Sequence, residues 1–142
     1  VALPVEKDVT DMDAAVAEGI KRGFTSFLLY GGMGGRPDHT FANFSLLARL
    51  SQKGYEARLF GDGFTVAAVT DGEIILNGEE GKTVSVFSWT DTSEGVFIRG
   101  MKYGAENAVL TSSFALGVSN SFTDSPARIS VSRGTLLIMR QL

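Results

Sequence analysis

The spacing of apolar residues changes halfway along the chain, and this change restricts the fold more than any other feature. Residues 8–23 place apolar side chains three and four positions apart, which predicts an amphipathic helix. Residues 24–30 form a short apolar, aromatic run bounded by glycine, which predicts a buried strand. A second helix is expected between Asp38 and Gly54, followed by a strand at 56–61. This alternation is typical of an α/β unit with parallel strands.

The second half of the chain predicts strands alone. From residue 64 onward, short apolar runs alternate with turn signals such as the one at 132–134. No stretch from 73 to 142 carries a helical apolar stripe of useful length. We therefore expect a partial Rossmann-like α/β unit in residues 1–71, followed by an all-β antiparallel sandwich in residues 72–142.

The predicted α/β half is small for a doubly wound domain. Residues 1–71 hold two predicted parallel strands and two helices, whereas such domains usually contain about 100 residues or more. We therefore expect this chain to be a fragment of a longer protein, with part of the α/β domain upstream of it. A partner subunit that covers an open sheet edge is the alternative explanation.

Composition and the N-terminal residues predict the broad class of the protein. With 142 residues, 44% of them hydrophobic and 20% charged, the chain has the composition of a globular protein. The N-terminus carries acidic residues where a secretory signal has a basic region and an apolar run. No window approaches the roughly 18 consecutive apolar residues of a membrane span. These features predict a protein that is neither secreted nor bound to a membrane.

Cysteine content and charge exclude further classes. Because the chain has no cysteine, it has no disulfide framework and no thiolate metal site, and it fits a reducing cytoplasm. The formal net charge of −3 argues against a general nucleic-acid binder, which needs a basic face. We predict a cytoplasmic protein that does not bind nucleic acid.

The segment GGMGGRPDH, residues 31–39, lies between the first predicted strand and the second predicted helix. Ligands bind α/β folds at the carboxyl ends of strands, where bare glycine backbone and a helix start attract anions. Arg36 adds a bidentate cation suited to phosphate. The spacing matches neither the Walker loop nor the dinucleotide fingerprint. A tight turn whose arginine pairs with a surface acid is the competing interpretation.

Three aspartates crowd the start of the first predicted helix, at positions 8, 11 and 13. Acids at this place stabilise the helix dipole, which is the simpler explanation for one or two of them. Carboxylate oxygens beside a phosphate site are also what Mg²⁺ requires, since it is usually held by one or two carboxylates and substrate phosphates. Both interpretations stay open from spacing alone.

The remaining candidates are a histidine and two polar segments of the second half. His39 is the single histidine of the chain, but the chain has no nucleophile elbow, which argues against hydrolase chemistry. Residues 100–104 and 117–122 are expected to form turns. Tyr103 offers a ring for stacking, and Ser119 and Asn120 offer donors and acceptors for a small molecule.

Taken together in chain order, these segments carry a specific resemblance. The segments are EKDVTD, GGMGGRPDHTFANFSLL, GMKYG, GVSNSF and ISVSRGTLLIM. The series resembles the C-terminal two-thirds of thiamine pyrophosphokinase, also called thiamine diphosphokinase. The resemblance implies that residues 1–71 are part of an ATP-binding catalytic domain and residues 72–142 a thiamine-binding sandwich. It also implies Mg²⁺ and a homodimer with active sites at the subunit interface.

The resemblance assigns roles to residues that match the motifs. It implies ATP binding by Thr10, Arg36, Asp38, His39 and Asn43, thiamine binding by Tyr103, Ser119 and Asn120, metal binding by Asp8 and Asp11, and catalysis by Asp11 and Arg36. One departure concerns the metal. The aspartate-rich strand ends of G-D-x-D-S type, which help to hold the metal in the family, are absent from this sequence.

The implied activity is transfer of a pyrophosphoryl group from ATP to the hydroxyl of thiamine, which gives thiamine diphosphate and AMP. Two alternatives remain from the sequence. In the first alternative, the chain is a non-catalytic ligand-binding or dimerisation module. In the second, it is a different nucleotide-dependent transferase that uses the same glycine-rich loop.

Overall fold

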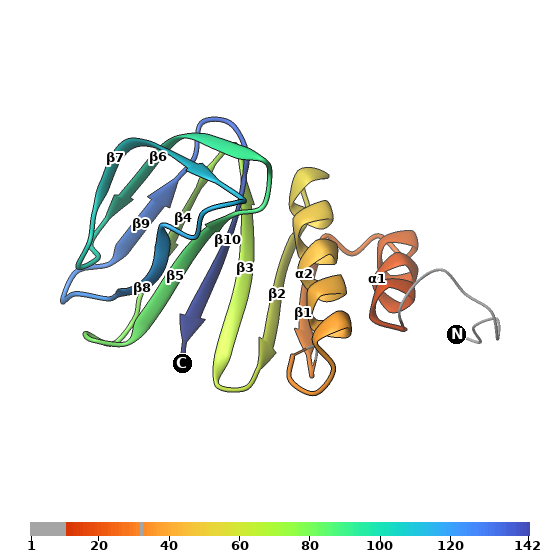
Figure 1. Cartoon of the computed structure of the whole chain (residues 1–142). Coiled ribbons are helices and arrows are strands. Elements are labelled where there is room, and N and C mark those ends of the chain that lie inside the picture. The colour runs from red at the N-terminus through yellow and green to blue at the C-terminus, as the bar shows by residue number, and fades with distance from the viewer. Residues whose placement is uncertain (1–10, 32) are drawn as a thin grey trace.

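The computed structural model describes residues 11–31 and 33–142 (Figure 1). The described residues contain two helices and ten strands, with one strand between the helices and the other nine after the second helix. The helices are α1 (Asp11–Lys21) and α2 (Pro37–Gln52). The strands are β1 (Ser26–Tyr30), β2 (Glu56–Gly61), β3 (Phe64–Thr70), β4 (Glu73–Leu76), β5 (Thr83–Ser88), β6 (Thr92–Arg99), β7 (Ala105–Thr111), β8 (Gly117–Ser121), β9 (Ala127–Ser130) and β10 (Thr135–Gln141). The helix and strand order predicted for the first half is confirmed, and residues 73–142 contain no helix.

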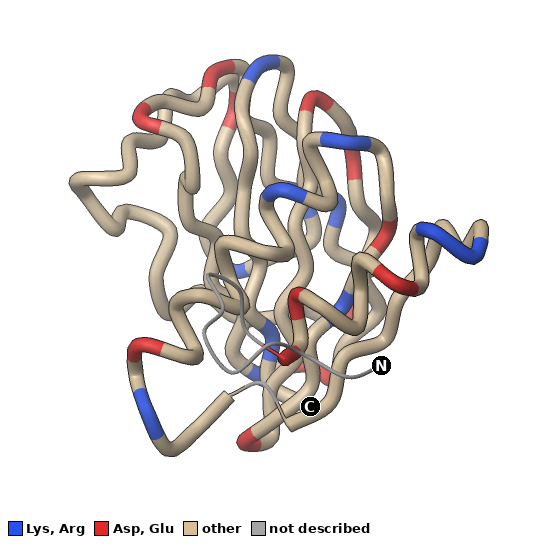
Figure 2. Tube along the Cα trace, turned by 90° about the vertical axis from the view of Figure 1, so that its right-hand side faces the viewer, with Lys and Arg blue, Asp and Glu red and all other residues tan. Residues whose placement is uncertain are grey.

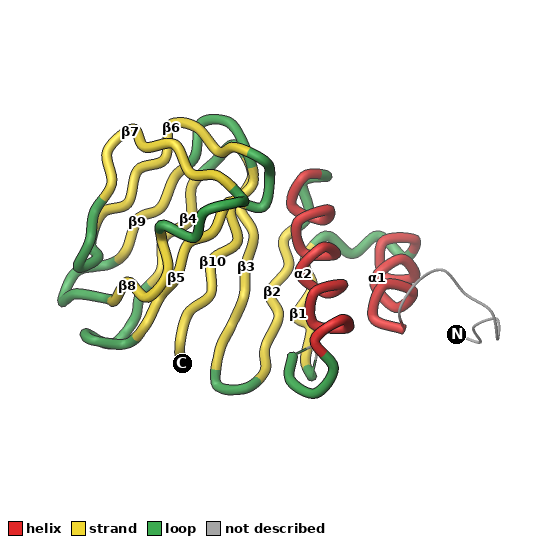
Figure 3. Tube along the Cα trace, in the orientation of Figure 1, coloured by secondary structure: helices red, strands yellow, loops and turns green. Residues whose placement is uncertain are grey.

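The strands form two sheets. One sheet has six strands in the order β1-β2-β3-β10-β5-β8, and the other has four in the order β4-β9-β6-β7. The pair β1–β2 is parallel and is joined through α2, whereas every other pair is antiparallel. Figure 3 shows the helices confined to one side of the molecule, beside β1, β2 and β3.

The six-stranded sheet takes strands from both halves of the chain, which differs from the expectation of two units in succession. β3 pairs along its whole length with β10, from Thr70 opposite Thr135 to Phe64 opposite Gln141. β3 has apolar side chains on both faces: Val66 packs toward the helices and Val69 toward the four-stranded sheet. A strand that is apolar on both faces needs cover on both sides, which a continuous central sheet provides.

Two apolar cores lie on opposite faces of this central sheet. Along β10, Leu136 and Ile138 face the four-stranded sheet, whereas Leu137 faces the helices. The helix-side core includes Leu46 and Leu47 of α2, which are 2% and 1% exposed. Complete burial of such a side chain contributes roughly 1.5–3 kcal/mol. The molecule therefore has three layers: helices, the six-stranded sheet and the four-stranded sheet.

The turn signals of the second half connect the two sheets. The turn after β3 leads from the six-stranded sheet into β4 of the four-stranded sheet, and residues 131–134 lead back from β9 to β10. Neither turn closes a hairpin, because the strands that flank it pair with other partners.

The prediction of a turn at residues 117–122 is wrong, because residues 117–121 form β8, the edge strand of the six-stranded sheet. The register with β5 shifts between Val84 and Val86, and Ser119 takes a left-handed conformation with φ of +59°. A β-bulge explains both observations, since it inserts an extra residue into a strand and re-aims its side chains. The polar, turn-forming residues therefore mark a bulge and not a chain reversal.

Charged residues of both signs are distributed along the fold. Figure 2 shows Lys and Arg interspersed with Asp and Glu on the described trace. No helix of the described residues is long and apolar enough to span a bilayer.

Candidate functional site

The glycine-rich loop follows β1 and ends at α2, as the sequence predicts. Gly34 and Gly35 have φ of +83° and +66°, in the left-handed region that favours glycine. Gly34 also lies against the turn between β2 and β3. A Cβ atom on Gly34 would be 2.7 Å from Oδ2 of Asp62, whereas one on Gly35 would meet nothing within 4 Å. Glycine at position 34 therefore allows both the backbone conformation and the close approach.

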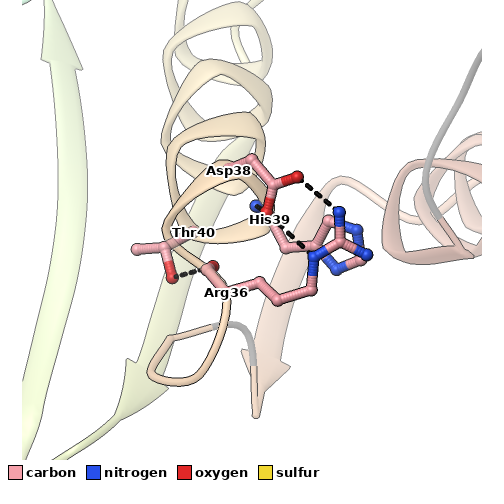
Figure 4. Close-up of polar contacts among 4 residues, drawn as sticks. All are labelled: Arg36, Asp38, His39 and Thr40. Atoms are coloured by element: carbon pink, nitrogen blue, oxygen red, sulfur yellow. Dashed lines mark hydrogen bonds and ion pairs between the residues drawn. The ribbon is translucent and has the colours of Figure 1, made fainter.

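The first turn of α2 contains the predicted cation and its acid. Arg36 donates from Nε to Asp38 Oδ1 at 3.2 Å and from Nη2 to Asp38 Oδ2 at 2.6 Å (Figure 4). Asp38 Oδ1 also accepts the backbone N–H of His39 at 2.9 Å. The hydrogen bond from Arg36 lowers the pKa of the Asp38 carboxyl below its ordinary value, and the His39 N–H acts in the same direction. The observed contact of Arg36 is therefore the one that the competing interpretation expected, a pair with an acid at the surface.

Arg36 nevertheless stays accessible. Its side chain is 68% exposed and that of Asp38 is 61% exposed. Surface ion pairs contribute little stability, so an incoming phosphate competes with the carboxylate at small cost. The arrangement holds a guanidinium at the start of a 16-residue helix, where the backbone dipole also favours an anion.

A cleft of about 490 Å³ begins beside this loop and runs across the helix-side face of the central sheet. Met33, Gly34 and Thr40 line its first end. Its remaining lining comes from the β2–β3 turn and from β3, β10, β5 and β8, namely Gly61, Asp62, Phe64, Val66, Met139, Thr83, Ser85, Phe87 and Ser119. The cleft therefore joins the glycine-rich loop to the bulged edge strand within one chain.

The two predicted thiamine-binding residues of β8 differ in their surroundings. Ser119 lines the cleft, and its backbone N–H donates to Ser85 Oγ at 3.0 Å. Asn120 is 5% exposed, accepts from the Tyr103 N–H at 2.9 Å and donates to the Tyr103 carbonyl at 2.6 Å. The Asn120 amide therefore fixes the segment around Tyr103 against β8. The ring of Tyr103 is 62% exposed, with Lys102 Nζ 5.3 Å from its centroid.

Of the two predicted metal ligands, Asp11 begins α1 and is not among the described residues that line the cleft, and Asp8 is not described. Thr10 also lies outside the described residues. In the first turn of α1, Asp13 accepts two hydrogen bonds from Arg49, both at 2.7 Å. Arg49 follows Arg36 by 13 positions in the chain, about 20 Å along a helix at roughly 1.5 Å per residue. Within residues 11–31 and 33–142, no three His, Cys, Asp or Glu side chains gather as a metal site requires.

Asn43 lies further along α2 and is 6% exposed. Asn43 is not among the described residues that line the cleft, whereas Thr40, one turn earlier, does line it.

Sequence reasoning missed several residues of the cleft, above all Asp62. A usable signal was present. Asp62-Gly63 follows β2 just as the glycine-rich loop follows β1, and parallel neighbours end at the same edge of a sheet. The Gly31 N–H donates to the Phe60 carbonyl at 3.1 Å, which ties the two strand ends together. The apolar floor residues Phe87 and Met139 carried no signal that distinguished them from core residues.

Comparison with known proteins identifies the family. The catalytic-domain model of thiamin pyrophosphokinase matches residues 1–59, and the model of its vitamin B1 binding domain matches residues 73–136. The chain belongs to the thiamin pyrophosphokinase family. The order of the two matches is that of the two halves of the sequence, and both matched segments contribute residues to the lining of the cleft.

Relatives within this family share both sequence and fold with the chain. The thiamine pyrophosphokinase of Bacillus subtilis is 26% identical over 136 residues, which cover 95% of this chain and 64% of the relative. Its crystal structure superposes with a TM-score of 0.87 over 96% of this chain, at 25% identity. A thiamin pyrophosphokinase structure from Geobacillus thermodenitrificans gives a TM-score of 0.84 over 98% of the chain, at 26% identity. The chain spans 64% of the length of each of these relatives.

Proposed function

We propose that the protein transfers a pyrophosphoryl group from ATP to the hydroxyl of thiamine, producing thiamine diphosphate and AMP. Membership of the thiamin pyrophosphokinase family supports the reaction class. The observation that carries the proposal is the cleft that connects the glycine-rich loop with Ser119 of β8. A transferase needs this connection, because donor and acceptor groups must meet at one place.

The proposed nucleotide side lies at the start of α2. Arg36 would exchange Asp38 for phosphate oxygens, because its guanidinium is exposed and suited to bidentate contact. Asp38 and His39 shape the first turn, and we propose that they orient this guanidinium and the helix N–H groups toward phosphate. Thr10 and Asn43 remain predicted nucleotide contacts from the family resemblance.

The proposed acceptor side lies at β8. Ser119 offers a hydroxyl at the end of the cleft, and Tyr103 offers an exposed ring beside the same strand. Asn120 would act by holding Tyr103 in place, since its amide is hydrogen-bonded to that residue's backbone. These roles make Asn120 a positioning residue and Ser119 a direct contact.

Magnesium is implied by the family resemblance. Asp11 supplies a hard oxygen ligand of the kind that Mg²⁺ prefers, but residues 11–31 and 33–142 do not assemble a metal cluster. The described residues therefore do not by themselves fit a complete site. Asp8 and Asp11 remain predicted ligands, as does a catalytic role for Asp11.

The proposed reaction is a direct transfer, in which the protein positions the substrates and forms no covalent bond with them. The thiamine hydroxyl oxygen attacks the β-phosphorus of ATP in line, the bond between that phosphorus and the bridging oxygen to the α-phosphate breaks, and AMP departs. The hydroxyl proton passes to solvent. Arg36 would neutralise phosphate charge in the transition state, and the cleft would hold the acceptor oxygen close to the loop.

We further propose that the chain uses a partial Rossmann-like unit, residues 1–71, for ATP and a β-sandwich, residues 72–142, for thiamine.

A homodimer is also proposed, with active sites at its interface. The connection between β7 and β8, together with the start of β8, supports a self-associating surface, because Phe114, Leu116 and Val118 are more than half exposed there. Sedimentation velocity at several concentrations tests the dimer, and cell fractionation tests the predicted cytoplasmic location.

Detection of AMP and thiamine diphosphate tests the proposed function directly. The full-length natural polypeptide, supplied with ATP, Mg²⁺ and thiamine, is expected to form both products in equal amounts. Calorimetry with thiamine and with a non-hydrolysable ATP analogue then separates the alternatives. Binding of thiamine with neither nucleotide binding nor product would favour a non-catalytic module, and turnover with other acceptor alcohols alone would favour a different transferase.

A further inference from the structure

The glycine-rich loop rests on the turn between β2 and β3. An added Cβ atom on Gly61, at the end of β2, would lie 3.2 Å from Met33 Cβ. An added Cβ atom on Gly34 would lie 2.7 Å from Asp62 Oδ2. The loop and the turn are therefore in close contact at two places. The loop keeps its position only as long as the turn keeps its own.

The end of β10 holds this turn from the other side. Gln141 pairs with Phe64, the first residue of β3. One residue further on, the Leu142 N–H donates to the Gly63 carbonyl at 2.8 Å, so the contact reaches the turn itself. The side chain of Leu142 is 54% exposed and does not anchor the segment by burial. Polar contacts are what hold Leu142 against the turn.

Lys82 supplies the strongest of these polar contacts. Its Nζ donates to the main-chain oxygen of Leu142 at 2.6 Å, and hydrogen bonds from a charged donor are stronger than those between neutral groups. A second, longer contact joins Nζ to Glu79 Oε2 at 3.8 Å. The side chain of Glu79 is 78% exposed, so this ion pair contributes little.

The main chain of Lys82 is itself fixed. Its N–H donates to the Glu79 carbonyl and its carbonyl accepts the Phe122 N–H, both at 3.0 Å. Phe122 directly follows β8. The next residue, Thr83, donates its N–H to Gln141 Oε1 at 3.1 Å. A continuous series of contacts therefore runs from the end of β8 through Lys82 and the end of β10 to the β2–β3 turn.

We propose that Lys82 is a positioning residue for the nucleotide side of the reaction. Its ammonium group holds Leu142 against the β2–β3 turn, and the turn supports the glycine-rich loop that precedes Arg36. Lys82 is not among the described residues that line the cleft, so it acts through the turn. When the turn leaves its place more often, fewer molecules have a loop ready for phosphate, and the apparent affinity falls in proportion. The inference rests on the proposed function, because it assigns polyphosphate to this loop.

Hydrogen exchange and steady-state kinetics of the full-length natural polypeptide test the proposal together. The variant Lys82→Met removes the ammonium group and keeps most of the aliphatic stem. Lys82→Arg keeps the charge and tests rescue. The matched control is Lys53→Met, which removes an exposed lysine just after α2, at the end of that helix far from the glycine-rich loop.

We expect amide exchange in peptides that contain residues 60–64 and 142 to be about three- to fivefold faster in K82M than in the unsubstituted protein. The KM for ATP should rise by about the same factor, whereas the KM for thiamine stays unchanged. K82R should recover most of both effects, and K53M should behave like the unsubstituted protein. Exchange in peptides from α2 should be the same in all variants, which shows that the fold is retained.

Each failure has a different meaning. Equal exchange in K82M and K53M would show that Lys82 does not hold the turn. Faster exchange with an unchanged KM for ATP would show that the turn does not position the loop. Either result overturns the inference and leaves the proposed function standing. If the unsubstituted protein forms no AMP from ATP, Mg²⁺ and thiamine, the proposed function fails and the positioning role fails with it.

Discussion

Arg36 Nη2 lies 2.6 Å from Asp38 Oδ2, so the cation proposed to hold phosphate is held in turn by an acid two positions along the chain. The contact places the guanidinium at the start of α2 before any ligand arrives. A pre-positioned cation loses less conformational freedom when phosphate binds, which strengthens binding without a new contact.

Replacement of Arg36 by alanine is expected to lower kcat/KM for AMP formation about 10²- to 10³-fold, because the transition state loses a charged hydrogen-bond donor. Arg36→Lys should recover part of the loss, since lysine keeps the charge without the bidentate geometry. The matched control is Arg22→Ala, which removes an exposed arginine paired with Glu18 on α1. Equal activity in R36A and R22A would contradict the role of Arg36.

Gly34→Ala is expected to destabilise the protein more than Gly35→Ala. Both residues have a left-handed backbone, which costs a non-glycine residue roughly 1–2 kcal/mol, but only the Gly34 methyl would meet Asp62. Urea unfolding of the two variants measures the difference. In a G34A/D62G double variant the extra loss should disappear, and persistence of the full loss would show that the Asp62 contact is not its cause.

Asn120→Ala is expected to lower the free energy of unfolding by about 1–3 kcal/mol, because the Tyr103 N–H and C=O lose their partner. The same variant should weaken thiamine binding if Tyr103 contributes to the site. Asn77→Ala, at an exposed position before the β4–β5 loop, serves as control. Thermal unfolding followed by circular dichroism gives the stability, and calorimetry gives the affinity. An N120A protein as stable as N77A would contradict the anchoring role.

The Arg36–Asp38 pair should make stability depend on pH at the acid end. The pKa of the Asp38 carboxyl is lower in the folded protein than its ordinary value of 3.8. The pair therefore stabilises the fold above the unfolded-state pKa, and this contribution is lost as the pH falls through the lowered folded-state pKa. Melting temperatures between pH 7 and pH 2.5 should differ between the natural protein and Asp38→Asn at neutral pH and converge in acid. A constant difference over the whole range would contradict this assignment.

The continuous central sheet should make both halves of the chain unfold together. Trp89, the single tryptophan, packs against the helix-side core and lies 5.4 Å from Phe41 of α2, measured between ring centroids. Urea curves from tryptophan fluorescence and from helical circular dichroism are expected to coincide. Leu137→Ala, buried on β10, should shift both curves equally, with a loss of about 2–5 kcal/mol. Two separate transitions would show that residues 1–71 and 72–142 are independent units.

Much of the local structure follows from the sequence because it depends on local physics. The apolar spacing in α2 and the glycine at position 54 predict the helix and its end, and both are confirmed. The pairing of β3 with β10 was not predictable in this way. It depends on which distant strand covers an apolar face, and many strands in the second half have a similar apolar pattern.

The candidate site likewise contains residues that the sequence predicts and a residue that it does not. The glycine-rich loop and Arg36 were recognisable because their residue types are unusual at the end of a strand. Asp62 was not singled out, since an Asp-Gly pair between two strands is the ordinary signature of a hairpin turn. Its place beside Gly34 depends on the parallel pairing of β1 and β2, which brings the two strand ends to one edge.

The seven residue pairs that join β3 to β10 also limit how the protein can move. A hinge that swings the proposed nucleotide side away from the proposed thiamine side would have to break this ladder, at the centre of the fold. Opening and closing of the cleft must therefore come from its rim, the short loops before α2 and after β2. We therefore expect substrate access to depend on movement of these loops around the sheet that forms the floor of the cleft.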